Sequence, residues 1–201
     1  MAWKGSGGTG SPMRDPKSYL TREQLEAVIA ATRSYRFKLL FYFLAFTGRR
    51  VSEVVRCLTP ADIDYENSLV NFTILKRRTP TRKLLPVKAA VLDKIRKHVR
   101  DAGIGRDDYI FPMSRQRVDQ VLKKSAEAVG IGAVGSGDHQ MHAHVFRHSY
   151  AVRSAKKLES PADLVELKDM LGHARIETTM YYLKFNPEEK RKLAENVWSE
   201  R

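Results

Sequence analysis

The 201-residue sequence predicts a mostly helical (α+β) domain with one small antiparallel β-sheet. Two observations support this fold class. Most of the chain places apolar residues at helical spacing, whereas residues 69–87 are rich in Val, Phe, Thr and Ile and read as a hairpin. The 42% hydrophobic content is typical of a globular chain, and the length suits a single domain with a proper core.

The first seventeen residues, MAWKGSGGTGSPMRDPK, predict a flexible tail, which we interpret as a linker or tag remnant before a domain over 18–201. The domain begins with a helix in LTREQLEAVIAATR, where Thr21 and Gln24 have the spacing of a capping box. The stretch RFKLLFYFLAFTGRR is apolar on nearly every side. It predicts a central buried helix that ends at Gly48.

After that helix, VSEVVRCL is predicted to continue as helix, and Thr59-Pro60 starts one more short turn. In the hairpin the segment KRRTPTRK joins the two arms, so its tip is strongly basic. A loop is expected at 130–140. Further helices are predicted at about 88–102, 114–129, 144–157, 161–171, 175–185 and 187–198.

The charge balance is the first indication of function. Thirty-six Lys and Arg against 23 Asp and Glu give a net charge of +13, which favours a polyanionic partner such as DNA. A merely soluble basic protein is the alternative. The sequence has no apolar run of transmembrane length, and its single cysteine, Cys57, cannot form an internal disulfide. We therefore expect a cytoplasmic protein with no membrane partner.

Arg49 and Arg50 follow the buried helix directly, after Thr47-Gly48. A guanidinium above an apolar core is costly to bury unless it meets an anion. The segment therefore indicates an anion site. A salt bridge to Glu53, one turn further on, or plain exposure would also account for these arginines.

The segment HAHVFRHSYAV is more specific, because His144 and Arg147 are three residues apart and share a helix face. A guanidinium matches two phosphate oxygens, and an imidazole can donate a hydrogen bond or relay a proton. A helix N-terminus with satisfied histidines is one alternative. The other is a metal site, in which His142 and His173 join His144 and His148. The sequence disfavours metal, because residue 145 is Val where an HExxH motif requires Glu.

Three further features are weak when taken singly. Lys76 lies on the hairpin, where charge often serves solubility, and His173 follows Leu171-Gly172, which could be only a capped helix end. The adjacent tyrosines 181 and 182 could be packing residues. Together with the arginines and His144 they form a cationic set without a carboxylate pair. Such a set suits a phosphodiester attacked by a side-chain nucleophile, with no metal or other cofactor.

The ordered motifs FTGRRVSE, LK, HVFRH and LGHARIETTMYY resemble the tyrosine recombinase (phage integrase) family, and within it the Xer-like site-specific recombinases. The resemblance covers roughly residues 18–190 and implies the catalytic-domain fold of that family. The family's first arginine follows TG and one further residue, which selects Arg50 over Arg49. Its nucleophile falls nine residues after the LGH histidine, which selects Tyr182 over Tyr181. The catalytic residues that the resemblance implies are Arg50, Lys76 (with Lys83 as the fallback), His144, Arg147, His173 and Tyr182.

The resemblance also implies a mechanism. Tyr182 attacks the scissile phosphate of double-stranded DNA, forming a 3′-phosphotyrosyl link and freeing a 5′-hydroxyl. Arg50 and Arg147 hold the phosphate oxygens, His144 and His173 donate to the phosphate or move protons, and Lys76 protonates the leaving oxygen. Neither ATP nor metal is needed. We expect further DNA contacts from Arg49, Arg77, Arg78, Arg82 and Lys83.

The family implication extends to assembly. Active enzyme is expected as a homo-tetramer on two DNA sites, with a nucleoid-associated location. The N-terminal core-binding domain that usually completes a clamp around DNA is expected to be absent from this chain. The last predicted helix, with Leu193 and Trp198 on one side, could dock on a neighbouring subunit or pack in cis. A nicking and resealing enzyme like the type IB topoisomerases, or a catalytically inactive DNA-binding module, are the alternative functions.

Overall fold

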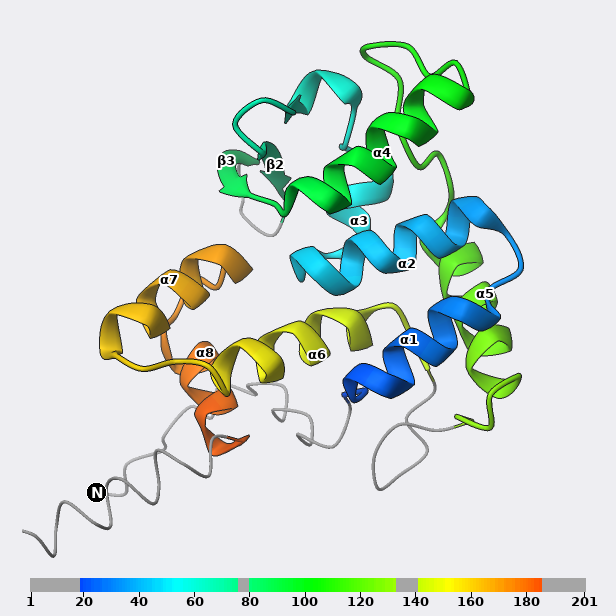
Figure 1. The fold of residues 1–201 in the computed structure, drawn as a ribbon. Coiled ribbons are helices and arrows are strands. Elements are labelled where there is room, and N and C mark those ends of the chain that lie inside the picture. Colours follow the sequence, from blue (N-terminus) through cyan, green and yellow to red (C-terminus); the bar gives the residue numbers. More distant parts are fainter. Residues whose placement is uncertain (1–18, 76–79, 133–140, 186–201) are drawn as a thin grey trace, which may run out of the picture.

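The structure is a computed structural model that describes residues 19–75, 80–132 and 141–185 (Figure 1). Over these residues the chain is mostly helical with a three-stranded antiparallel sheet, which confirms the predicted fold class. The elements are α1 (Arg22–Ala31), α2 (Tyr35–Thr47), α3 (Val51–Val55), η1 (Pro60–Asp62), β1 (Ile63–Asp64), β2 (Leu69–Ile74), β3 (Thr81–Pro86), α4 (Ala89–Asp101), α5 (Arg115–Glu127), α6 (His144–Ala155), α7 (Pro161–Leu171), α8 (Glu177–Met180) and η2 (Tyr181–Phe185).

Two local predictions at the start of the domain are confirmed. The Thr21 hydroxyl accepts a hydrogen bond from the backbone N–H of Gln24, and the side-chain oxygen of Gln24 accepts one from the backbone N–H of Thr21. These two bonds complete the capping box. Helix α2 is buried along most of its length and ends at Gly48, whose φ of 62° lies in the left-handed region. Glycine adopts that conformation without the Cβ clash that other residues meet.

The sheet is a meander in the order β1–β2–β3. Alternate residues of β2, namely Val70, Phe72 and Ile74, are buried, as expected of a strand with one face on the core. The hairpin was predicted from its residue types. Its second arm is longer than expected, because β3 begins at Thr81, inside the segment KRRTPTRK that was predicted to join the arms. Strand β1 was not predicted, because two residues are too few to show a periodic pattern. The hairpin tip, with Lys76, Arg77 and Arg78, lies outside the described residues, as does the predicted helix at 187–198.

Helix α2 is the central element: it contacts α1, α4 and α6, and α5 packs on α1 (Figure 1). A large core forms around α2, with Phe41, Phe43 and Phe146 fully buried. A second, smaller core lies where the C-terminal half of α6 meets α7 and η2, and it includes Leu171 and Tyr182. Helix α6 therefore belongs to both cores and joins them.

The predicted helix over 175–185 is divided in the structure. Only Glu177–Met180 is α-helical, and the following residues form the 3₁₀ helix η2. The Thr179 amide already bonds the carbonyl of Ile176, three residues back, so the tightening begins within α8. Sequence periodicity does not distinguish these two helix types over a single turn.

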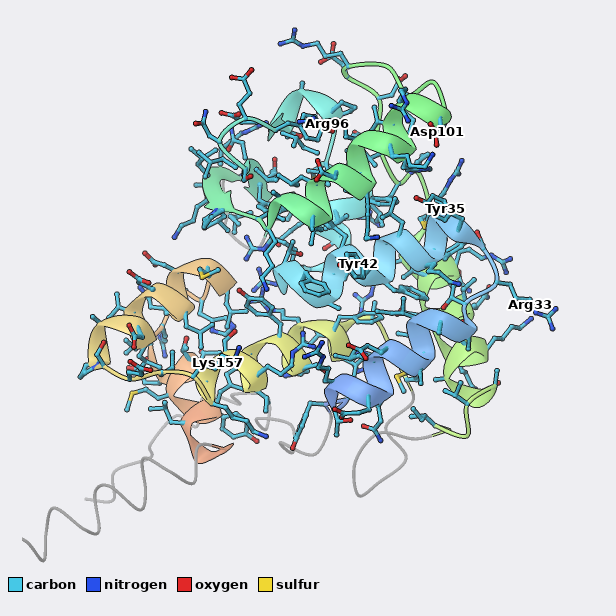
Figure 2. All side chains as sticks on the ribbon, in the orientation of Figure 1. Arg33, Tyr35, Tyr42, Arg96, Asp101 and Lys157 are labelled. Atoms are coloured by element: carbon cyan, nitrogen blue, oxygen red, sulfur yellow. The ribbon has the colours of Figure 1, made fainter. Side chains whose placement is uncertain are left out.

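Exposed basic side chains are spread widely over the molecule. Arg33, Arg96 and Lys157 point outward from three separate parts of the fold (Figure 2). Net charge alone therefore does not locate a functional site. In the part of the chain that the structure describes, no helix is long and apolar enough to cross a bilayer.

Gly48 offers a test of the junction after α2. A Cβ atom built on Gly48 would lie 2.5 Å from Cδ1 of Tyr150, whereas one on Gly103, at the same φ of 62°, would meet nothing within 4 Å. We expect Gly103→Ala to lose about 1–2 kcal/mol of unfolding free energy from backbone strain alone. Gly48→Ala should lose about 1–3 kcal/mol more, because the ring of Tyr150 must move.

Urea unfolding of the two variants beside the parent protein measures both effects. Equal losses would show that Tyr150 does not constrain the junction.

Candidate active site

The end of α2, the end of α7 and the first turns of α6 meet at Arg147. Its side chain is 2% exposed. Nη1 donates to the carbonyl of Gly48 (3.0 Å) and Nη2 donates to the carbonyl of Leu171 (2.5 Å). These carbonyls belong to the C-terminal ends of two helices, which carry partial negative charge. The buried cation is thus held between two helix ends.

Burial, and then the nearby charges of Arg50 and Arg49, lower the pKa of Arg147 to about 9. The guanidinium therefore remains protonated at neutral pH. Two of its five N–H donors bond the helix carbonyls, which leaves donors for an anionic ligand.

Arg49 is also buried, at 1% exposure. Its Nη2 donates to the carbonyl of Met170 (2.7 Å), its guanidinium lies 5.2 Å from the ring centroid of Phe72, and its Nε is 3.8 Å from a Glu53 oxygen. The salt bridge to Glu53 was the alternative interpretation of this segment, and it is present. Because the side chain has no exposed surface and Glu53 already gives it an anionic partner, we do not retain Arg49 among the proposed DNA contacts.

Arg50 is oriented by the same carboxylate but keeps an open side. Nη1 of Arg50 lies 2.9 Å from one Glu53 oxygen, and the backbone amide of Arg50 donates to the other (3.2 Å). The Arg50 side chain is 17% exposed, whereas that of Glu53 has no exposed surface. Arg50 thus keeps a partly exposed side chain, whereas Arg49, for which we expected a DNA contact, is interior and bonds the end of α7.

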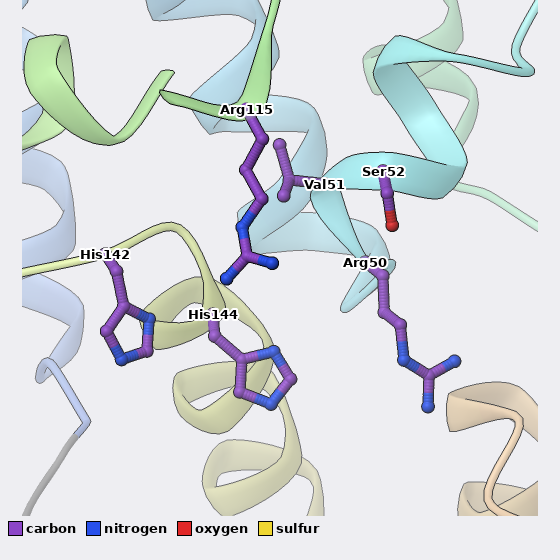
Figure 3. Close-up of a pocket in the computed structure, with 6 residues that line it drawn as sticks. All are labelled: Arg50, Val51, Ser52, Arg115, His142 and His144. Atoms are coloured by element: carbon purple, nitrogen blue, oxygen red, sulfur yellow. The ribbon is translucent and has the colours of Figure 1, made fainter. Parts of the chain in front are cut away.

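A pocket of about 480 Å³ opens beside Arg50 (Figure 3). Its polar lining comes from α3, the start of α5 and the start of α6, and Arg115 extends toward His144. Five of the six lining residues can donate hydrogen bonds and none is acidic, so the pocket suits an anion. The lining residues are Arg50, Val51, Ser52, Arg115, His142 and His144.

His144 is neutral in this environment. Its pKa is lowered to about 2, mainly by burial. The neighbouring His148 and Arg147 contribute smaller decreases to this pKa. A neutral imidazole has one N–H donor and one acceptor. His144 can therefore donate a hydrogen bond to a phosphate oxygen without adding positive charge to the site.

The two tyrosines differ sharply in environment. Tyr182 is 6% exposed, and its hydroxyl lies 2.8 Å from Nδ1 of His148. Its ring stacks on that of His173, with centroids 6.4 Å apart and planes at 9°. Tyr181 is partly buried against the smaller core, with its ring at 79° to that of Tyr182. Burial raises the pKa of Tyr182, and the opposing charge of Arg147 is the smaller effect. The phenol is therefore protonated at neutral pH.

His173 follows Gly172, which ends α7 in the left-handed region with a φ of 66°. Its Nδ1 lies 2.9 Å from the hydroxyl of the buried Thr179, which fixes the ring over Tyr182. The helix-cap interpretation of LGH is thus confirmed, and the cap also places the histidine.

Of the basic residues predicted on the hairpin, the structure describes two. Arg82 is exposed and pairs with Asp62, and Lys83 lies 3.4 Å from Asp169 near the end of α7. Lys83 is opposite Phe72 in the strand register, on the face that turns toward α7. Lys76, Arg77 and Arg78 stay predictions, because they lie outside the described residues.

The metal alternative required His142, His144, His148 and His173 to gather around one point. Across residues 19–75, 80–132 and 141–185, no group of three or more His, Cys, Asp or Glu side chains is arranged to hold a metal ion. His148 and His173 instead both contact Tyr182.

Sequence reasoning missed the roles of Arg115 and His148. Arg115 is the first residue of α5, and nothing near it in the sequence connects it with α3 or α6. His148 was considered only as a metal ligand. Its position four residues after His144 placed both on one helix face, but the contact with Tyr182 spans 34 residues and is a tertiary feature.

Solved structures share this fold. The chain superposes on the XerA recombinase with a TM-score of 0.68 at 19% identity, covering 95% of this chain and 66% of that one. The catalytic domain of bacteriophage HP1 integrase gives 0.64 at 19% identity, covering 88% and 93%. A XerH recombinase bound to its difH substrate gives 0.69 at 20%, covering 93% and 56%. The fold is that of tyrosine recombinase catalytic domains.

The family follows from sequence comparison. Residues 18–189 match the model of the phage integrase family. The tyrosine recombinase XerA of Thermococcus onnurineus is 30% identical over 197 residues, covering 92% of this chain and 64% of the relative. The tyrosine recombinase XerD of Halalkalibacterium halodurans is 31% identical over 186 residues, covering 84% and 57%. The chain belongs to the phage integrase family, and it spans less than two thirds of the length of these relatives.

The low pKa of His144 predicts a pH-dependent stability. The unfolded chain binds a proton at this residue below about pH 6.5, whereas the folded protein does so only near pH 2. Because the unfolded state binds more protons, this contribution is complete above pH 6.5 and is lost as the pH falls. At pH 5 it should lower the unfolding free energy by about 2 kcal/mol relative to pH 7.5.

Urea unfolding at the two pH values, with His144→Asn as the matched variant, isolates the contribution. The variant should show a smaller pH dependence than the parent. An identical pH dependence would mean that His144 titrates normally in the folded protein.

Proposed function

We propose that this chain is the catalytic domain of a site-specific recombinase that cuts and rejoins double-stranded DNA through a 3′-phosphotyrosyl intermediate. The observation that carries the proposal is one junction that gathers Arg50, Arg147, His144, His173 and Tyr182 from four separate elements. Among the described residues, four cationic or hydrogen-bond-donating side chains and one nucleophilic oxygen meet there, and the buried Glu53 carboxylate holds Arg50. Membership of the phage integrase family supports the same chemistry.

In the proposed reaction the oxygen of Tyr182 attacks the scissile phosphate. Arg147, held from behind by the two helix ends, and Arg50, held by Glu53, stabilise the charge on the non-bridging oxygens. His144 and His173 donate hydrogen bonds to the phosphate. The 5′-oxygen leaves with a proton from Lys76, a role for which Lys83 is the fallback.

The proposed partner is double-stranded DNA, and XerH supports this because its structure holds a difH substrate. The pocket beside Arg50 extends the proposed DNA surface to Arg115, whose side chain is 63% exposed. Arg82 and Lys83 remain proposed DNA contacts.

We further propose that the active form is a homo-tetramer on two DNA sites. A dimer of lambda integrase on a core site supports assembly on DNA. The predicted nucleoid-associated location, and the domain boundaries at residues 17 and 18, stay predictions.

Covalent trapping tests the proposed function. The protein is incubated, without Mg²⁺, with a library of nicked duplexes that carry a randomised core, and the products are separated on a denaturing gel. A DNA-linked protein band is expected for the parent protein and for Tyr181→Phe. Tyr182→Phe should form at least 10³-fold less adduct, because it lacks the attacking oxygen.

Loss of the band in Tyr181→Phe alone would move the nucleophile by one residue. A parent protein that binds DNA but forms no adduct on any duplex would support the inactive DNA-binding module instead. Joined products from two duplexes distinguish recombination from nicking and resealing.

The salt dependence of DNA binding tests the contact through Arg115. Each phosphate contact contributes about one unit to the slope of log Kobs against log salt. Arg115→Gln should reduce that slope by about one, and Arg33→Gln, in the exposed turn after α1, is the matched control. A slope in Arg115→Gln equal to that of the control would exclude Arg115 from the DNA interface.

A further inference from the structure

His148 contacts the atom at which the proposed reaction begins. Its Nδ1 lies 2.8 Å from the hydroxyl oxygen of Tyr182. His148 follows Arg147 directly on α6 and lies one turn after His144, whose ring it meets edge to face at 4.6 Å between centroids. The same helix therefore presents a phosphate-binding guanidinium and a nitrogen directed at the nucleophile.

The attack requires a proton acceptor. Tyr182 is buried, which raises the pKa of its phenol above the usual value of about 10, so the hydroxyl carries its proton near neutral pH. The charge of Arg147 acts on the phenol of Tyr182, but a guanidinium has no atom that can accept a proton. Nδ1 of His173 is engaged with the hydroxyl of Thr179. Nδ1 of His148 is thus a ring nitrogen already at hydrogen-bond distance from the phenol.

We propose that His148 is a catalytic residue that accepts the phenolic proton of Tyr182, an inference that rests on the proposed function. In the cleavage step the O–H bond of Tyr182 breaks and its proton moves to Nδ1 of His148. The electron pair of the phenolic oxygen forms the new bond to phosphorus. The bond from phosphorus to the 5′-oxygen breaks, and that oxygen leaves with its electron pair and takes a proton from the general acid.

Rejoining reverses each transfer. A 5′-hydroxyl attacks the phosphotyrosine and returns its proton to the general acid, and the departing phenolate recovers its proton from the His148 imidazolium. The positive charge on His148 is present only while the phosphorus centre carries additional negative charge. The phosphate therefore offsets the repulsion between the imidazolium and Arg147 during the step itself.

Two substitutions separate proton acceptance from positioning. Asparagine places an amide group near the position of the histidine Nδ1, so His148→Asn can accept the hydrogen bond of the phenol but cannot hold its proton. His148→Ala removes both functions. General acid–base groups contribute about 10²–10⁴-fold to rate, so we expect both variants to form the phosphotyrosyl adduct at least 10²-fold more slowly than the parent.

The rates are measured under single-turnover conditions on a nicked duplex that the parent protein selects from the randomised library. Added imidazole should accelerate His148→Ala and leave the parent unchanged, a response that a structural role for His148 would not produce. Gel-shift affinity and thermal unfolding of each variant are measured in parallel. If His148→Ala does not fold, His148→Asn alone decides the question.

A His148→Asn rate near that of the parent would overturn the proposal, because a hydrogen bond alone would then suffice. A His148→Ala rate within twofold of the parent would overturn it as well. Both results assume a reactive parent. A parent that forms no adduct overturns the proposed function, and the role of His148 with it, so the two failures are distinguishable.

Discussion

The fold of this domain depends on buried guanidinium groups that are bonded to helix C-termini. Arg147 joins the end of α2 to the end of α7 through the carbonyls of Gly48 and Leu171, and Arg49 reaches the adjacent carbonyl of Met170. An unpaired buried cation would cost several kcal/mol, but the last carbonyls of a helix lack partners within the helix and carry partial negative charge. Arg147 and its two carbonyls satisfy one another, whereas Nε and Nη1 of Arg49 have no hydrogen-bond partner among the described residues. These bonds hold the two hydrophobic cores in one orientation.

This arrangement leaves an excess of positive charge at the junction. Arg49 and Arg50 share one buried carboxylate, that of Glu53, while Arg147 bonds only neutral carbonyls among its described partners. Burial, and then the charge of neighbouring groups, lowers the pKa of both Arg147 and His144. A bound phosphodiester would supply the missing negative charge. The junction is therefore suited to stabilise a negative charge that develops during reaction.

Tyr182, the proposed nucleophile, also has a packing role. Its ring belongs to the smaller core, between α6 and α7, and its hydroxyl reaches His148. Adjacent residues on a helix point about 100° apart, so a position that buries Tyr182 turns Tyr181 elsewhere. The change from α8 to the tighter η2 occurs at Tyr181, and this local geometry sets the direction of both rings. Packing against the core thus determines which tyrosine meets the cationic groups.

Local sequence patterns were enough to predict the fold class, the capping box at Thr21, the helix ends at Gly48 and Gly172 and the presence of a hairpin. These features depend on local periodicity and on backbone conformations that few residue types adopt. The sequence also predicted Arg50, His144, Arg147, His173 and Tyr182 through spacing and family resemblance. The folded structure was needed to show that Arg49 is interior, that Arg115 lines the pocket and that His148 contacts Tyr182. Each of these three features depends on contacts between segments that are far apart in the chain. Local sequence patterns cannot predict such contacts.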